Sequence, residues 1–313
     1  MSTLAYAGER VLVGSSSAMK AVRDYVGKVA QSDASVLISG PTGTGKELVA
    51  ESIHRASRRR SAPFVSVNCA AIPDSLLESE LFGYQRGAFT GANEHYPGKL
   101  RLADHGTVFL DEIGEMSPVG QSKILRVLES REVFPLGARH MTRIDVRFLA
   151  ATNQDLELMI QQRAFRQDLF FRLNVGRIYL PSLRERREDI LELFRYFVQF
   201  FNAQQDRSVQ APTPELAARL ASYDWPGNVR EIRNCVEAVF IDPPNGPIDL
   251  EHLPESFQRI FRCYRGSTVS ERDAIVSALS RTNWNKKMAA RELRWSRMTL
   301  YRKLEKYNIT TSH

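Results

Sequence analysis

Short apolar runs alternate with segments of helical period between residues 36 and 180. The apolar runs are SVLISG, PFVSVN, GTVFLDE and DVRFLAATN, and after each one apolar positions recur every three to four residues. Strands that are apolar on both faces and alternate with helices are typical of a parallel sheet covered by helices on both sides. The pattern therefore predicts a doubly wound α/β domain, to which we assign residues 1–175.

The pattern becomes helical after residue 180. The segments ILELFRYFVQFF, PELAARLASY and NVREIRNCVEAVF predict a small all-helical domain over residues 176–242. The stretch DPPNGP then interrupts the pattern with three prolines and a glycine, which predicts a linker over residues 243–269. A last helical module is expected over residues 270–313.

Positive charge is concentrated in this last module. Residues 281–306 carry nine Lys and Arg against two Glu, which equals the net charge of +7 of the whole chain. A basic module attached to a neutral body indicates a polyanionic partner, with a solvated surface helix as the alternative that charge alone leaves open.

Two features of the composition indicate a reduced, cytoplasmic protein without a membrane anchor. No run approaches the roughly 18 to 20 apolar residues of a membrane helix, and the N-terminus lacks the pattern of a secretion signal. Cys69, Cys235 and Cys263 stand far apart without metal-ligand spacing, so we expect buried thiols.

A phosphate-binding loop is predicted at residues 40–46. The sequence GPTGTGK fits G-x-x-x-x-G-K and stands between the strand VLIS and the helix ELVAESIH. Glycines let backbone N–H groups point toward a phosphate, and the helix N-terminus and Lys46 add positive potential. Glu47 stands where a Ser or Thr usually supplies an Mg²⁺ ligand. The residues of this predicted site are Gly40, Pro41, Thr42, Gly43, Thr44, Gly45, Lys46 and Glu47.

Acidic and polar residues end two later strands of the predicted sheet. TVFLDE ends in Asp111, which can hold Mg²⁺, and Glu112, which can polarise an attacking water. FLAATN ends in Asn153, at the sheet edge where open α/β folds bind ligands, with a simple turn former as the alternative. Phosphoryl transfer also needs a guanidinium near the γ-phosphate. The candidates, among which chemistry alone does not choose, are Arg166, Arg172 and Arg230.

Together these motifs resemble the AAA+ domain of bacterial sigma-54-dependent transcription activators, also called enhancer-binding proteins. The resemblance extends from Val13 to Ile309, and its most specific element is GAFTGA at residues 87–92, preceded by ELFG. Other matching blocks are SVNCAAIP, FLDEIGEM, LRVLE, FRQDLFFRLNV, LPSLRERREDI and WPGNVREI. The resemblance implies an AAA+ P-loop parallel sheet with a helical lid, followed by an all-α C-terminal helix-turn-helix domain.

The resemblance gives the matched residues their catalytic roles. It implies that Lys46 and its loop bind the ATP phosphates, that Asp111 coordinates Mg²⁺, and that Glu112 activates water. Asn68 corresponds to a switch asparagine that restrains the catalytic glutamate according to the nucleotide state.

The remaining matched residues are implied to sense the nucleotide or to complete the site of a neighbour. Asn153 corresponds to sensor I and Arg230 to sensor II. Arg166 and Arg172 correspond to arginine fingers that reach into the adjacent subunit, which implies a homo-oligomeric ring, normally a hexamer.

The resemblance also gives a purpose to the apolar, glycine-hinged GAFTGA loop. It implies an insertion in a helix that the nucleotide state raises or lowers, so that Phe89 and Thr90 press against sigma-54. The alternative is that Phe89 folds back onto its own domain. The residues implied to contact sigma-54 are Gly87, Ala88, Phe89, Thr90, Gly91 and Ala92.

The basic tail predicts two helices joined by a short turn. In the second helix Leu300 and Leu304 share one face, while Thr299, Arg302 and Lys306 lie on another. This is the pattern of a helix-turn-helix, and it resembles the Fis-type DNA-binding domain. The residues predicted to contact DNA are Lys286, Lys287, Arg297, Thr299, Arg302, Lys303 and Lys306.

The combined hypothesis is an ATPase, with ATP and Mg²⁺ as cofactors, that binds enhancer DNA and remodels sigma-54 RNA polymerase holoenzyme from the closed to the open promoter complex. A nucleotide-switched DNA-binding repressor or scaffold without turnover is the alternative, which Glu112, Arg166 and Arg172 disfavour. An AAA+ protease or chaperone subunit should carry a pore motif in place of GAFTGA. Because the pattern begins near residue 13, without the family's usual sensory domain, we expect either a short activator controlled in trans by a regulatory protein or an excised piece.

Overall fold

The computed structural model describes residues 11–263 and, toward the C-terminus, residues 275–276, 278–279, 282, 284–293, 295, 297–307 and 309. The chain divides into two compact units, Met1–Pro254 and Glu255–His313.

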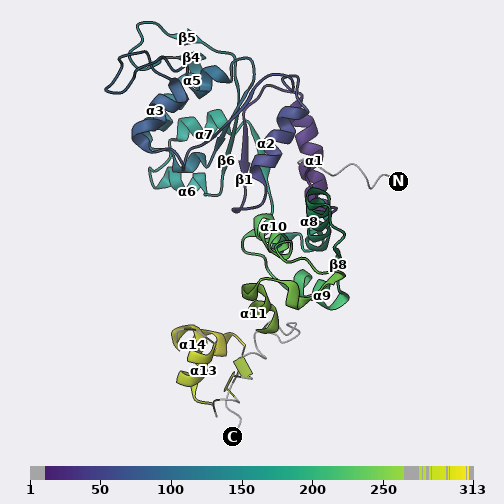
Figure 1. Ribbon diagram of the computed structural model, residues 1–313. Coiled ribbons are helices and arrows are strands. Elements are labelled where there is room, and N and C mark those ends of the chain that lie inside the picture. Colours follow the sequence, from purple (N-terminus) through teal and green to yellow (C-terminus); the bar gives the residue numbers. More distant parts are fainter. Residues whose placement is uncertain are drawn as a thin grey trace. The chain divides into compact units, whose positions relative to one another are not determined.

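Five parallel strands form the central sheet of the first unit (Figure 1), in the order β2-β3-β6-β1-β7. Their bounds are β1 (Val36–Ser39), β2 (Phe64–Asn68), β3 (Thr107–Asp111), β6 (Arg147–Thr152) and β7 (Gly176–Tyr179). The parallel sheet is confirmed. Strand β7, however, lies in the range assigned to the helical domain, because GRIY alternates buried and exposed positions at a sheet edge and so lacks a continuous apolar run.

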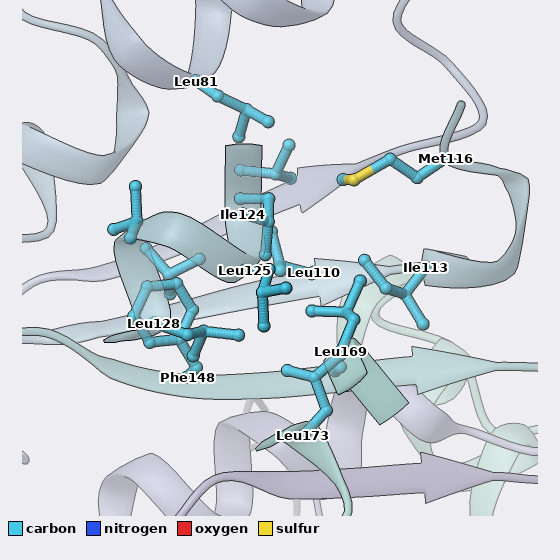
Figure 2. Packing of buried hydrophobic residues seen from close by; sticks show 14 of the residues in the cluster. Leu81, Leu110, Ile113, Met116, Ile124, Leu125, Leu128, Phe148, Leu169 and Leu173 are labelled. Carbon is cyan, nitrogen blue, oxygen red and sulfur yellow. The ribbon is translucent and has the colours of Figure 1, made fainter. Parts of the chain in front are cut away.

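Helices cover both faces of this sheet (Figure 1). Helices α1 (Ser17–Ala30) and α2 (Lys46–Arg55) lie on one face, and α3 (Asp74–Phe82), α5 (Pro118–Ser130) and α7 (Gln167–Leu173) lie on the other. Successive side chains of strand β3 point to opposite faces of the sheet. Phe109 packs toward α1 and α2, whereas Val108 and Leu110 pack into the cluster on the other face. Figure 2 shows Leu110 in that cluster, among Ile113, Ile124 and Leu169. Burial on both faces explains why this strand is apolar throughout.

Smaller elements complete this α/β part. They are α4 (Lys99–Leu102), α6 (Leu156–Gln161), the 3-10 helices η1 (Ile113–Glu115) and η2 (Leu183–Glu185), and the antiparallel pair β4 (Glu132–Val133) and β5 (Thr142–Arg143).

A helical lid follows the sheet. It consists of α8 (Asp189–Gln205), α9 (Pro214–Ser222) and α10 (Asn228–Val239), and the buried Trp225 lies between the last two helices and donates its indole N–H to the Leu220 carbonyl at 2.8 Å. The range 243–269, expected to be a linker, contains ordered elements in its described part: β9 (Pro247–Ile248), which pairs with β8 (Gln210–Pro212), then η3 (Leu250–His252) and α11 (Glu255–Cys263). Proline is tolerated at the end of an edge strand, so the prolines that suggested a linker do not prevent this pairing.

The second unit contains α11, α13 (Lys286–Glu292) and α14 (Arg297–Lys306) in its described part. Its core is formed by Ile275, Ala278, Leu279, Ala289, Ala290, Leu300 and Leu304. The apolar face expected for the second helix of the helix-turn-helix is therefore buried, as the spacing of Leu300 and Leu304 predicts.

Cys69 and Cys235 are buried free thiols, as expected, while the side chain of Cys263 lies outside the described residues. Burial raises the pKa of the Cys69 thiol to about 12. Among the helices that the structure describes, none combines the length and the apolar character needed to span a bilayer.

Candidate nucleotide-binding site

The predicted phosphate loop connects β1 to α2. Gly43 and Gly45 have φ values of 77° and 105°, which favour glycine, and α2 begins directly at Lys46. A Cβ atom on Gly43 would lie 2.4 Å from the backbone oxygen of Gly227, so the loop and the lid approach too closely there for a side chain. The first turn of α2 therefore presents its N–H groups beside the glycine loop, as an anion site requires.

Lys46 is buried beneath this loop. Its Nζ donates to the Gly40 carbonyl at 3.1 Å and lies 3.9 Å from Glu112 Oε1. Loss of hydration lowers the pKa of Lys46, whereas the nearby Glu112 and Asp111 carboxylates oppose that shift. A phosphate placed here would add the anionic partners that a buried ammonium group needs.

Glu112 and Asn153 meet because β3 and β6 are neighbouring parallel strands that end at the same sheet edge. The Asn153 backbone N–H donates to Glu112 Oε2 at 3.3 Å, and its side-chain amide donates to Thr42 Oγ1 at 2.9 Å. Glu112 has a φ of 51°, an uncommon conformation for a residue with a side chain, and such strain clusters at functional sites. The structure thus joins the predicted catalytic glutamate to the phosphate loop through Asn153.

Asp111 and Asn68 stand opposite each other on β3 and β2. Asp111 Oδ1 accepts a hydrogen bond from the Glu112 backbone N–H at 3.0 Å. The Asn68 carboxamide oxygen accepts from the backbone N–H groups of Ala70 at 3.0 Å and Ala71 at 3.2 Å. That oxygen is therefore turned toward its own loop and not toward Glu112, although Asn68 lies at the predicted edge.

The residues at this edge fit a magnesium ion only in combination with a phosphate ligand. In the described part of the chain, no group of three or more His, Cys, Asp or Glu side chains could hold a metal. Mg²⁺ at nucleotide sites commonly takes one or two carboxylates and obtains its other ligands from phosphates and water. Asp111 fits the carboxylate role because it lines the cavity beside the phosphate loop.

A cavity of about 520 Å³ lies over the phosphate loop, between the α/β part and the lid. Its polar lining includes Thr42 to Glu47, Asp111, Glu112 and Arg230. Its apolar lining includes Val11, Leu12, Val13, Leu193, Tyr196, Phe197 and Phe200. Polar groups for phosphates and apolar groups for a flat base suit a nucleotide.

The sequence did not lead us to expect several residues in or beside this cavity. The aromatic side chains of α8 have the helical spacing of ordinary core residues, which hides their place in a cavity. Asn228 was also missed: its side-chain amide donates to the Thr42 carbonyl at 2.9 Å, and its oxygen accepts from the Leu183 N–H at 2.8 Å. Its position directly after Pro-Gly, at a φ of 52°, is the one signal that could have indicated a special role.

The three candidate arginines separate in the structure. Arg230 lines the cavity, and its backbone N–H donates to the Gly43 carbonyl at 3.2 Å. Arg166 lies at the start of α7, where its guanidinium donates two hydrogen bonds to the Asp168 carboxylate, at 3.0 and 2.7 Å. Arg172 forms an ion pair with Glu129 at 3.3 Å. Arg166 and Arg172 are exposed and are not among the cavity-lining residues of their own chain.

The GAFTGA loop lies between α3 and α4, so it is an insertion between helices. Its base is closed by the Tyr84–Tyr96 backbone bridge, and Gly137 of the neighbouring loop packs against Ala88. Phe89 is 44% exposed and makes an edge contact with the Tyr84 ring, with centroids 5.0 Å apart. The aromatic side chain therefore touches its own domain and still presents a large part of its surface to a partner.

Residues predicted to contact DNA lie on α13 and α14 of the second unit. Arg302 is exposed on α14, while Lys303 lies over the Trp295 ring at 5.0 Å and Lys286 lies over the Tyr301 ring at 5.2 Å. Thr299 is half-buried. The predicted side chains of Lys287, Arg297 and Lys306 lie outside the described residues.

Comparisons with known families match the chain in three consecutive parts. The profile described as Sigma-54 interaction domain matches residues 12–179, that of the AAA+ ATPase lid domain matches residues 184–262, and that of the bacterial regulatory protein, Fis family, matches residues 268–307. The chain belongs to the bacterial sigma-54-dependent transcription activators. For this family member the AAA+ fold, the helical lid and the Fis-type helix-turn-helix are thereby confirmed.

Individual relatives agree with the family assignment. The activator is 44% identical over 310 residues to Transcriptional regulatory protein ZraR of Klebsiella oxytoca, which covers 94% of this chain and 68% of that protein. It is 42% identical over 314 residues to Regulatory protein AtoC of Escherichia coli, with coverage of 96% and 68%. Its structure resembles that of NtrX from Brucella abortus in complex with ATP, with a TM-score of 0.72, 35% identity, and coverage of 94% of this chain and 68% of that chain.

Proposed function

We propose that this chain hydrolyses ATP and uses the energy to remodel sigma-54 RNA polymerase holoenzyme at promoters. The observation that carries the proposal is the contact of Glu112 with both Lys46 and Asn153 beside the phosphate loop, where Lys46 and Glu112 line the cavity. A phosphate-binding lysine and a carboxylate held at the same point are what hydrolysis of a terminal phosphate needs. The ATP-bound crystal structure of the similar NtrX supports a nucleotide in this cavity.

Each residue of the site has a specific part in the proposed reaction. Lys46 and the N–H groups of the loop bind the phosphates, and Arg230 approaches them from the lid. Glu112 orients a water and accepts its proton while the bond between the γ-phosphorus and the bridging oxygen breaks. Magnesium, held by Asp111 together with the phosphates, would supply charge neutralisation on the phosphate oxygens.

We further propose that the reaction requires a ring of these chains. Arg166 and Arg172 are exposed outside their own cavity, so they are available to a neighbouring site, and a head-to-tail contact that closes on itself gives a ring, normally a hexamer. Nucleotide state would then move the loop that carries Phe89 against sigma-54, and the second unit would bind enhancer DNA. Such partners place the protein in the cytoplasm.

Measurement of ATP turnover against protein concentration tests the proposal. Specific activity should rise with assembly, and Glu112→Gln should lose at least about a hundredfold in turnover while it still binds ATP. Glu115→Gln is the matched control, because Glu115 is exposed three residues further along and bonds to Gln154. Nucleotide binding without turnover in the unmodified protein would favour the switched repressor or scaffold instead.

A further inference from the structure

Arg186 is a buried guanidinium at the side of the nucleotide cavity. The residue is 2% exposed and lines the cavity together with Thr44 and Lys46. Its Nη2 donates to the Thr44 carbonyl at a long 3.4 Å, and its buried Nε has no hydrogen-bond partner among the described residues. A guanidinium carries five N–H donors and is normally well satisfied when buried, so Arg186 retains unused hydrogen-bonding capacity beside the phosphate loop.

The charge of Arg186 is balanced from the other side by Asp189. This carboxylate is fully buried at the first position of α8, and its Oδ2 lies 3.9 Å from Arg186 Nη1. Burial lowers the pKa of Arg186, and Asp189 is the main charge that opposes the shift. The pair is therefore loose, with a gap longer than a hydrogen bond.

Asp189 is held more tightly by the beginning of the described chain. The Ser16 backbone N–H donates to Asp189 Oδ1 at 2.8 Å, and the Ser16 hydroxyl donates to Oδ2 at 2.6 Å. A Cβ atom on Gly14 would lie 2.7 Å from the same carboxylate. Residues 11–16, which we name the N-terminal segment, are thus docked on the lid through the buried Asp189 and, at the surface, through Glu192, whose Oε2 accepts from the Ser15 N–H at 2.8 Å.

The N-terminal segment is also part of the cavity wall. Val11, Leu12 and Val13 line the same cavity as Arg186 and Thr44. A continuous series of contacts therefore runs from the phosphate loop at Thr44 through Arg186 and Asp189 to Ser16. Thr44 lines the cavity at one end of this series, and at the other end Ser16 belongs to the segment whose residues 11–13 line it.

We propose that Arg186 and Asp189 are positioning residues that couple the docking of the N-terminal segment to occupancy of the nucleotide cavity. An anionic phosphate at the loop attracts the guanidinium and occupies its unused N–H capacity, which fixes Arg186 against Asp189 and so fixes Ser16. Because coupling between two binding events is reciprocal, any force or partner that releases this segment weakens nucleotide binding by the same factor. The inference rests on the proposed nucleotide site.

Hydrogen exchange of the backbone amides of residues 11–16 measures this coupling, with ADP and Mg²⁺ as the probe and the full chain as the sample. Saturating ADP should slow exchange of these amides by about tenfold in the unmodified protein. Arg186→Gln and Ser16→Ala should each bind ADP more weakly, and at saturating ADP they should show little of this slowing. Lys20→Ala is the matched control, since Lys20 is exposed on α1, the helix that begins directly after Ser16.

The outcomes separate this inference from the proposed function. Absence of ADP binding by the unmodified protein defeats the proposed nucleotide site itself. ADP binding without a change in exchange at residues 11–16, or equal slowing in Ser16→Ala and the unmodified protein, overturns the coupling alone. Ser16→Ala decides the matter if Arg186→Gln fails to fold, which circular dichroism at the start of the experiment shows.

Discussion

The side-chain amide of Asn153 donates a hydrogen bond to the Thr42 hydroxyl at 2.9 Å, while the backbone N–H of the same residue contacts Glu112. One residue at the end of β6 thus connects the phosphate loop with the carboxylate proposed to activate water. A substitution of its side chain should affect catalysis more than binding, because the link between Thr42 and the Glu112 carboxylate is lost while the rest of the loop still binds the phosphates.

Asn153→Ala should therefore lower ATP turnover by about ten- to a hundredfold and change the Kd for ATP by less than about threefold. Gln154→Ala is the control, because the Gln154 side chain, next to Asn153 in the sequence, donates a hydrogen bond to the exposed Glu115 and not to the loop. Steady-state turnover and equilibrium titration measure the two quantities. A weaker Kd with unchanged turnover at saturating ATP would mean that Asn153 serves binding alone.

The exposed arginines of α7 should be required for turnover and not for stability. Arg166→Ala and Arg172→Ala remove only surface contacts, namely the ion pairs with Asp168 and Glu129 and the hydrogen bond from Arg166 to Ser122, so the Tm should stay within about 2 °C. Turnover should fall by about a thousandfold or more, as expected for a lost arginine finger. Arg55→Ala removes a comparable exposed pair, with Glu51, and should leave turnover unchanged.

Mixing provides a sharper test of these fingers. Inactive Glu112→Gln subunits still present Arg166 to their neighbours, so adding them to Arg166→Ala subunits should restore part of the turnover. If mixed samples never exceed the sum of their separate activities, the intersubunit assignment is wrong.

The GAFTGA loop should separate hydrolysis from promoter opening. Thr90 is exposed at the tip of the loop, so Thr90→Ala should leave ATP turnover within about twofold and abolish open-complex formation with purified sigma-54 polymerase. Thr90→Ser retains the hydroxyl and should restore part of the activity. Normal promoter opening by Thr90→Ala would remove the loop from the proposed contact.

The second unit should bind DNA mainly through charge. Arg302 is exposed on α14, so Arg302→Ala should weaken DNA binding and reduce the slope of log affinity against log salt by about one. Arg58→Ala removes an exposed charge from the first unit and serves as the control. An affinity that does not depend on salt would contradict a phosphate-binding role.

Stability should fall in mild acid because of His54. This residue is buried on α2, and its Nδ1 lies 3.0 Å from Thr107 Oγ1. Loss of hydration is the main cause that lowers the pKa of His54 in the folded state. The unfolded chain then binds more protons between that lowered pKa and the usual value near 6.5, so the free energy of unfolding decreases as the pH falls below about 6.5.

The loss should be on the order of 1 kcal/mol between pH 7.5 and 5.5 in urea unfolding, and His54→Gln should remove most of that slope. His140→Gln, at an exposed histidine, should retain it. The carboxylates whose pKa is lowered, such as those of Asp33 and Asp145, change the free energy of unfolding only below about pH 4, so they do not affect the slope measured between pH 7.5 and 5.5. An unchanged slope in His54→Gln would assign the acid sensitivity to another group.

The sequence predicted those features that depend on local pattern. Strand β3 is apolar throughout because both its faces are covered, and Asp111 and Glu112 follow it at the edge where ligands bind. Strand β7 was missed because only one of its faces is buried, which leaves four residues with no distinctive run. A strand that is buried on both faces has a continuous apolar run in the sequence, whereas a short strand that is buried on one face does not.

Relationships between distant segments were less accessible. Arg186 and Asp189 look like charges on a polar helix start, and their burial follows from contacts with Thr44 and Ser16 far away in the chain. The Asn68 side chain stands at the expected strand end, yet its oxygen bonds to the following loop, a choice that depends on local turn geometry.

At Gly43 and Gly227 the backbones of the phosphate loop and the lid are in direct contact, without room for a side chain on Gly43. Helix α10 begins at the residue after Gly227 and its 12 residues extend for about 18 Å. Since no compressible side chain separates the two backbones, a displacement of a few tenths of an ångström at the loop must tilt this helix, and the tilt grows into a larger movement at its far end. Occupancy of the phosphate loop should therefore bias the angle of the lid, and a methyl group at Gly43 would force the two backbones apart.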